Sequence, residues 1–170
     1  QAAQVAQDWQ QAPALIALSP YLRTHQTAQA TIERFPSVPT RVLPMEEFTY
    51  LEPSRWNGTA RSSRLPHIEA YWAQANPDYQ DGPGAESFAT LLQRVAHTLQ
   101  ALAQLPADAR VYAFSHGQFM QAVRVALLYP QWTAQQQMAH FWPFNTAHPI
   151  LNTDKLEVTL REGRWSTPSV

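Results

Sequence analysis

Short apolar runs alternate along the chain with longer stretches in which apolar residues recur every three or four positions. The clearest runs are Ala14–Leu18 and Val111–Phe114, and each predicts a buried strand that is covered on both faces. Further strands are predicted near residues 40–43, 149–151 and 156–161, with Gly163 ending the last of them. Strands that alternate with helical stretches are typical of an α/β domain.

The helical stretches lie between these strands. Apolar residues trace one face of a long helix that starts near Phe88 and ends near Pro106. Ser19 and Pro20 supply an N-cap and a first helical residue, and they predict a helix that continues to about Phe35. Other helices are predicted at residues 1–11, 68–75, 118–128 and 134–141, whereas residues 46–66 form a long irregular loop.

Composition narrows the classes of function. The chain has 170 residues, of which 45% are hydrophobic, enough for the core of one globular domain. Twelve basic and thirteen acidic side chains give a net charge of -1, without the basic excess of proteins that bind nucleic acids or membrane surfaces. The absence of cysteine excludes disulfides, thiolate zinc sites and cysteine nucleophiles. Neither a signal peptide nor a membrane span is recognisable, so we expect a cytoplasmic protein.

The most informative polar residues lie where predicted strands turn into helices. His116 and Gly117 follow the strand at residues 111–114, at the edge where open α/β sheets bind ligands. Glycine lets a ligand approach the backbone, and the free N–H groups of the following helix can hold an anion. Spacing alone gives equal weight to a functional His116 and to a histidine that merely caps the helix.

Ser19 and Arg23 repeat this arrangement after the strand at residues 14–18. Arg23 lies at the positive end of the predicted helix dipole, where a cation costs about 0.3–1 kcal/mol. A bound phosphate would offset that cost, and a solvated arginine is the alternative. Glu46 and Glu47 open the aromatic loop that follows the next strand. A carboxyl group at this place could donate or accept a proton during catalysis. The alternative is that both glutamates are simply exposed to solvent.

Three other chemistries fail on the sequence. Ala113-x-Ser115-x-Gly117 resembles a nucleophile elbow, but no histidine follows any acidic residue downstream of Ser115, as that triad requires. The six histidines include no pair at the helical metal-binding spacing, so no metal site is expected. The glycine-rich signatures of the Rossmann and Walker phosphate loops are absent from the sequence.

Taken together, these motifs resemble the histidine phosphatase superfamily, which has the phosphoglycerate mutase-like fold. Ser19–Ala28 is similar to its S-x-x-x-R-x-x-Q-T-A segment, and Phe114–Gly117 is similar to its second histidine motif. Glu47 resembles the acid that begins its variable loop, and residues 84–88 followed by Arg94 resemble the start of its long helix. The resemblance covers most of the chain and implies a three-layer sandwich, with a mainly parallel central sheet and helices on both faces.

The resemblance also implies a phosphomonoesterase that works through a phosphohistidine intermediate. The family nucleophile is a histidine in an Arg-His-Gly motif. Arg23 and His116, with Ser19 and Gly117, would bind the phosphoryl oxygens, and Glu47 would protonate the leaving oxygen and then activate water. We expect a small phosphorylated substrate, no metal or other cofactor, and a monomer or homodimer. The long loop carries aromatic and arginine side chains that would suit a lid over the phosphate about as well as they suit ordinary surface packing. They are Tyr50, Arg55, Trp56, Arg61 and Arg64.

The printed sequence contains no Arg-His-Gly motif. In the family this motif ends a first strand, central to the sheet, ahead of the helix to which residues 1–11 are similar. We therefore expect residues 1–170 to be a single domain that lacks its first strand, preceded by about 20–40 further residues. A catalytically inactive protein that binds a phosphorylated ligand is the alternative. A mutase-type phosphotransferase is disfavoured, because a chain of about 200 residues leaves little room for lid insertions.

Overall fold

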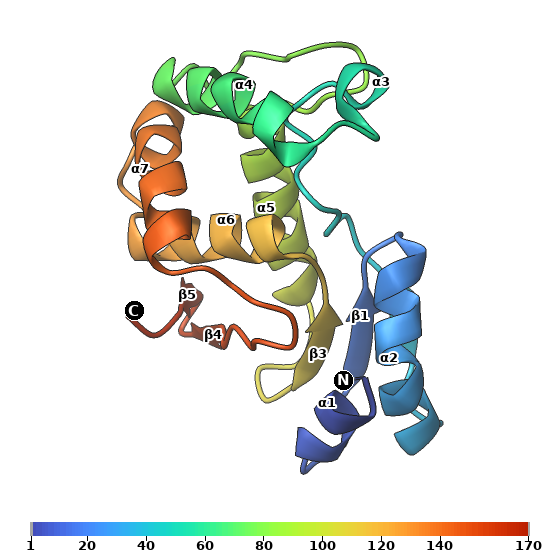
Figure 1. Ribbon diagram of the computed structural model, residues 1–170. Helices are drawn as coiled ribbons and strands as arrows, with labels where there is room; N and C mark the ends of the chain where they lie inside the picture. The colour runs from blue at the N-terminus through green and yellow to red at the C-terminus, as the bar shows by residue number, and fades with distance from the viewer. Residues whose placement is uncertain (1, 170) are drawn as a thin grey trace.

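Three parallel strands form the central sheet of the computed structural model, which describes residues 2–169 (Figure 1). Their order is β2 (Thr40–Val42), β1 (Leu15–Leu18), β3 (Val111–Phe114). Ile16 in the middle strand pairs with Thr40 on one side and with Tyr112 on the other. Within the described residues, the second edge of β3 pairs with no strand. A mixed α/β fold with a parallel central sheet confirms the predicted fold class.

Helices cover both faces of this sheet. Figure 1 shows α1 (Ala2–Asp8) and α2 (Leu22–Arg34) on one side, with α5 (Phe88–Leu102) and α6 (Gly117–Leu128) on the other. Ile16 and Leu18 belong to the apolar cluster of α1 and α2, whereas Ala17 between them belongs to the larger core. β1 is therefore buried on both faces, as predicted. In β3 the face that carries Ala113 is exposed, so the prediction of burial on both faces is wrong for this strand.

The larger core fixes the segment that follows β2. It joins that segment to α4 (Arg61–Ala73), α5 and α7 (Ala134–Ala147). Trp72 stacks on Phe141 with ring centroids 5.0 Å apart, and Phe48 packs edge-on against Phe88 at 6.1 Å. Burying each such ring stabilises the fold by roughly 1.5–3 kcal/mol. Phe48 thus anchors the residues on either side of it, Glu47 among them.

The long loop predicted at residues 46–66 contains helical structure. α3 (Pro53–Trp56) begins at a proline, and its N-cap Glu52 accepts a hydrogen bond from the Ser54 amide. α4 starts at Arg61 and passes through Pro66, so the helix predicted at residues 68–75 begins seven residues earlier. Proline at the sixth position removes only one hydrogen bond near the helix start, which the helix tolerates.

The C-terminal elements also differ from the prediction. Residues 149–151 form no strand, and the strand predicted at residues 156–161 is limited to β4 (Thr159–Arg161). Gly163 does not end the sheet, because Glu162 and Gly163 form a two-residue turn with φ of 50° and 75° that leads into β5 (Arg164–Ser166). Helix α7 continues to Ala147, past the predicted end at residue 141. No helix within residues 2–169 has both the length and the apolar character needed to cross a membrane.

Candidate active site

The carboxyl ends of β1 and β3 lie side by side and bring two predicted site residues together. β1 leads through Ser19 into α2, whose second residue is Arg23, and β3 leads into His116 at the N-cap of α6. The Ser19 amide donates a 3.1 Å hydrogen bond to the Phe114 carbonyl oxygen, which joins the two strand ends. Residues more than 90 positions apart in the sequence therefore share one site.

His116 is 6% exposed, and both of its ring nitrogens have partners. Its Nδ1 accepts from Nε of Arg23 at 3.0 Å and lies 2.7 Å from Nη2 of the same guanidinium. Its Nε2 lies 2.8 Å from Oγ of Ser19. Because arginine only donates, Nδ1 must be the unprotonated nitrogen, and the proton on Nε2 is donated to Ser19. His116 is thus neutral and makes no capping hydrogen bond to the helix.

Burial lowers the pKa of His116 to about 4, and the positive charges of Arg23 and Arg94 act in the same direction. This direction agrees with the hydrogen bonds, which require a neutral ring. An anion placed beside the ring would raise the pKa of His116, because it would favour the protonated form.

Ser19 does not cap α2, contrary to the prediction from the Ser-Pro pair. The helix starts at Leu22 with Tyr21 as its N-cap, and no side chain caps it. Ser19 is fully buried, and its Oγ accepts from the Tyr21 amide at 3.2 Å in addition to its contact with His116. The Ser19 hydroxyl therefore binds both the local Tyr21 amide and the distant imidazole, while the extended backbone of Tyr21 delays the start of the helix to Leu22.

Arg23 lies at the start of α2, as predicted, and reaches across to His116. It is exposed as a residue, and its guanidinium carbon lies 4.8 Å from the centroid of the Tyr21 ring. The Tyr21 ring in turn meets the His116 ring edge-on, with centroids 5.1 Å apart. An aromatic face and an imidazole lone pair therefore offset the cost of placing a cation at this helix end.

The two adjacent glutamates point to different partners. Glu46 faces Nη1 of Arg94 at 3.2 Å. Glu47 turns toward α6, where its Oε1 accepts from the Gln118 amide at 3.1 Å. Burial raises the pKa of Glu47, and the amides of Phe48 and Gln118 and the charge of Arg23 oppose that rise. Glu47 is therefore the carboxyl group on the side of His116, and its raised pKa suits a proton donor.

The start of α6 completes the arrangement. The helix begins at Gly117, so the free N–H groups of its first turn directly follow His116. A Cβ atom added to Gly117 would lie 3.4 Å from the Ile150 carbonyl oxygen, in the segment that follows α7. A guanidinium, an imidazole, a carboxyl group and a helix N-terminus thus meet at one sheet edge. These groups can bind an anion and transfer a proton.

The side chains of the predicted lid have separate partners. Tyr50 is buried against Tyr71 and Trp72, with ring centroids 4.9 and 5.3 Å apart. Arg55 forms a 2.8 Å ion pair with Asp81. Trp56 packs on His67, at 4.2 Å between ring centroids, while Arg61 is exposed and Arg64 is half-buried. Contacts with α4 and with Asp81 therefore engage Tyr50, Arg55 and Trp56.

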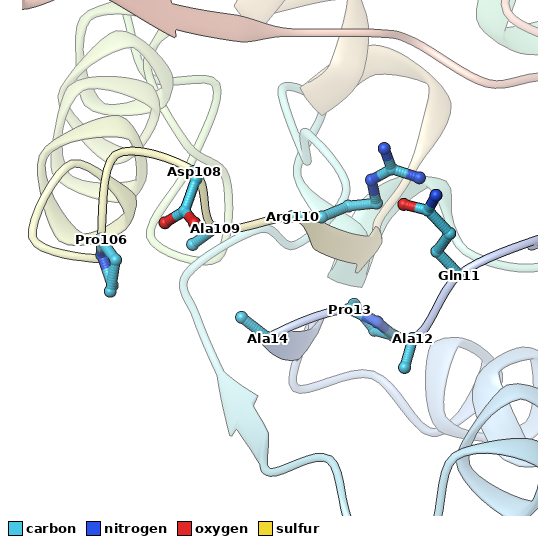
Figure 2. A pocket seen from close by; sticks show the side chains of 8 residues that line it. All are labelled: Gln11, Ala12, Pro13, Ala14, Pro106, Asp108, Ala109 and Arg110. Carbon is cyan, nitrogen blue, oxygen red and sulfur yellow. The ribbon is translucent and has the colours of Figure 1, made fainter.

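A surface hollow of about 370 Å³ lies away from this site (Figure 2). Its lining comes from the segments that precede β1 and β3, namely Gln11, Ala12, Pro13, Ala14, Pro106, Asp108, Ala109 and Arg110. Those segments meet at the amino ends of the strands, where the Ala14 amide donates to the Arg110 carbonyl oxygen at 2.8 Å. Within residues 2–169, no group of three or more histidine, aspartate or glutamate side chains could hold a metal ion.

Sequence reasoning missed two contributors to the site. The bond between Ser19 and His116 has no local signal. Arg94 has one, because it is the only arginine, lysine or acidic residue in the fifteen residues of α5. A single charge in an otherwise amphipathic, uncharged helix indicates a specific partner, and Arg94 has several at the loop that carries Glu47.

Comparisons with known proteins extend these observations. An α-ribazole phosphatase from Shigella flexneri has a similar structure, with 13% sequence identity and a TM-score of 0.69 over 98% of this chain and 78% of that chain. A mycobacterial glucosyl-3-phosphoglycerate phosphatase shows 20% identity and a TM-score of 0.66 over 98% and 80% of the two chains. No curated protein matches the chain. The family model of the histidine phosphatase superfamily (branch 1) matches residues 1–165, so the chain belongs to that superfamily, as the sequence motifs predicted.

Proposed function

We propose that this protein hydrolyses a small phosphomonoester through a phosphohistidine intermediate. The observation that carries the proposal is the contact between Arg23 and His116 at the carboxyl edge of the sheet, with Glu47 bonded to the start of the adjacent helix. Phosphate needs cationic and N–H donors on one side, and its leaving group needs a proton donor on the other. The two phosphatases with similar folds favour hydrolysis over mutase-type transfer.

The proposed first step is attack by a histidine nitrogen on phosphorus. The bond from phosphorus to the ester oxygen breaks, and Glu47 gives its proton to that oxygen. Arg23 and His116 bind the phosphoryl oxygens, assisted by Ser19 and the Gly117 amide. In the second step the Glu47 carboxylate takes a proton from water, and the resulting hydroxide attacks phosphorus. Inorganic phosphate leaves, and the histidine is restored.

The proposal assigns the nucleophile to an Arg-His-Gly segment outside the 170 residues, because the printed sequence has none. The same observation favours a second candidate function, which is binding of a phosphorylated ligand without turnover. For the hydrolase we further propose a cytoplasmic monomer or homodimer that needs no metal or other cofactor.

The experiment uses the product of the gene's complete reading frame and p-nitrophenyl phosphate as substrate. His116→Ala and Arg23→Ala are each expected to lower kcat/KM by at least about 10²-fold. His97→Ala and Arg41→Ala change exposed residues of the same types and are expected to leave kcat/KM unchanged. Circular dichroism of each variant reports whether it stays folded.

Wild-type rates in folded His116→Ala and Arg23→Ala would refute the site. A complete reading frame that lacks Arg-His-Gly and hydrolyses no phosphomonoester would refute the hydrolase. Phosphate binding that is lost in both variants would then support the second candidate.

A further inference from the structure

We infer that Arg94 is a positioning residue that holds Glu47 against the start of α6. The inference rests on the proposed role of Glu47 as the proton donor. Arg94 lies in α5, outside the cluster formed by Arg23, His116 and Ser19, and its side chain is only 16% exposed. Its role follows from where its guanidinium nitrogens donate.

One edge of the guanidinium is held by Glu86, which lies just before the N-cap of α5. Nε donates to Oε1 of Glu86 and Nη2 donates to Oε2, both at 2.7 Å. Such a bidentate pair fixes the plane of the guanidinium as well as its position. The guanidinium carbon also lies 5.3 Å from the centroid of the Phe119 ring in the first turn of α6. Arg94 is therefore oriented from two sides before it meets the loop.

The remaining nitrogen binds the backbone directly ahead of Glu47. Nη1 of Arg94 donates to the Pro44 carbonyl oxygen at 2.9 Å and to the Glu46 carbonyl oxygen at 3.2 Å. It also lies 3.2 Å from Oε2 of Glu46. These contacts turn the Glu46 side chain toward α5, so its neighbour Glu47 points the other way. The choice between the two glutamates is thus made by Arg94.

Two further bonds hold the segment on either side. Oγ of Ser115 donates to the Met45 carbonyl oxygen at 2.8 Å, which ties the loop to the residue before His116. The Glu86 amide donates to the Thr49 carbonyl oxygen at 2.7 Å. Arg94 adds the link to α5 and, through Phe119, to α6. The position of the Glu47 carboxyl group relative to His116 therefore depends on a framework in which Arg94 makes the most contacts.

The charge of Arg94 and its geometry can be separated by experiment. The charged side chain that acts on Glu47 is Arg23, whereas the Arg94 guanidinium faces Glu46 and Glu86. A change in Glu47 titration after substitution of Arg94 therefore reports a moved carboxyl group. Lysine keeps the charge but cannot make the forked bond to Glu86 while it also binds the loop.

The experiment is a titration of the Glu47 carboxyl carbon by NMR in the product of the gene's complete reading frame. In Arg94→Lys, we expect the pKa of Glu47 to fall toward the ordinary glutamate value, because the released carboxyl group gains water. Arg124→Lys is the matched control, since Arg124 is half-buried and donates to the His148 carbonyl oxygen, away from Glu47. There the Glu47 titration is expected to match wild type.

An unchanged Glu47 titration in folded Arg94→Lys overturns the inference. If that variant does not fold, Glu86→Gln replaces it, because glutamine keeps one acceptor but breaks the fork. A shift in the same direction supports the positioning role, and no shift overturns it. The titration requires no turnover, so its outcome is independent of whether the protein proves to be a phosphatase.

If the complete protein is active, a second measurement isolates proton donation. In Arg94→Lys, kcat/KM for an alkyl phosphate should fall about 10²-fold, the usual contribution of a general acid. For p-nitrophenyl phosphate it should fall far less, because that leaving group departs without a proton. Equal losses on both substrates would contradict a role that acts through Glu47. Absence of hydrolysis in wild type would instead count against the phosphatase alone.

Discussion

Two nitrogens of the Arg23 guanidinium converge on a single acceptor atom of His116, Nδ1 of the imidazole, at 3.0 and 2.7 Å. The arrangement excludes a proton on Nδ1 and fixes the ring as the neutral tautomer that donates to Ser19. A phosphate that binds Arg23 has to compete with this lone pair. Proton binding and folding are therefore linked at one residue, and the proposed phosphate would be linked to both.

The linkage predicts how stability depends on pH. The pKa of His116 is about 4 in the folded protein, below its ordinary value of 6.5. Between these values the unfolded chain binds a proton that the folded chain does not, so the free energy of unfolding decreases as pH falls from 6.5 toward 4. Urea unfolding at several pH values should show a smaller decrease for His116→Asn than for wild type. The exposed-residue control His97→Asn should follow wild type, and identical curves for all three would contradict the lowered pKa.

Phosphate binding is predicted to take up a proton between about pH 5 and pH 7. When Arg23 donates to a phosphate oxygen, Nδ1 of His116 is released, and the adjacent anion favours the protonated ring. Calorimetric titration with inorganic phosphate in buffers of different ionisation enthalpy measures this uptake directly. We expect the apparent enthalpy to vary with the buffer for wild type and to vary much less for His116→Asn. An enthalpy that is the same in every buffer would show that His116 keeps its neutral form when phosphate binds.

Much of the site could be predicted from local rules, because parallel strands present their carboxyl ends at one edge. That rule alone is enough to place Arg23 and His116 at the same edge. The choice between Glu46 and Glu47 could not be made locally, since it depends on Arg94, which lies 48 residues after Glu46. The prediction of Ser19 as a cap is wrong because α2 begins only at Leu22, although the Ser19 hydroxyl still binds the local Tyr21 amide. Its second partner, His116, lies 97 residues away, and no local rule predicts that bond.

The fold shows the same division between local and distant causes. β1 is predicted well because continuous apolar residues report burial on two faces. The predicted α4 is too short, because the pattern near Pro66 suggests a loop and the packing of Tyr71 and Trp72 against the core stabilises the whole helix. The β4–β5 hairpin escapes prediction although Gly163 is a local signal. A glycine after an apolar run is compatible both with the end of a strand and with a two-residue turn between two strands. In the structure Gly163 belongs to such a turn, between β4 and β5.

This turn gives a direct test of the corrected hairpin. Gly163 has φ of 75°, and a Cβ added there would meet no atom within 4 Å, so a substitution tests backbone conformation alone. Gly163→Ala should destabilise the hairpin by roughly 1–2 kcal/mol, whereas Gly163→Asn should cost less because asparagine tolerates positive φ. Hydrogen exchange of the amides in β4 and β5 measures the effect. Equal protection in both variants would mean that the turn does not hold the two strands together.

Ser19→Ala provides the test of the buried bond to His116. The substitution removes the acceptor for the imidazole Nε2 proton and for the Tyr21 amide, at a position that is fully buried. A buried donor left without a partner costs about 1–3 kcal/mol, so urea unfolding at about pH 7.5 should show a loss in that range. The exposed Ser63→Ala in α4 is the matched control and should stay within about 0.5 kcal/mol of wild type.

The same pair of variants separates a structural role of Ser19 from a role in orienting the imidazole ring of His116. Once the Ser19 hydroxyl is absent, the Nε2 proton has no acceptor, and among the described residues the contact with Arg23, which keeps Nδ1 unprotonated, is the sole remaining polar restraint on the ring. The ¹⁵N chemical shifts of the imidazole should then change in Ser19→Ala and stay as in wild type in Ser63→Ala. If the shifts and the stability of Ser19→Ala both match wild type, Ser19 neither supports the fold nor orients His116.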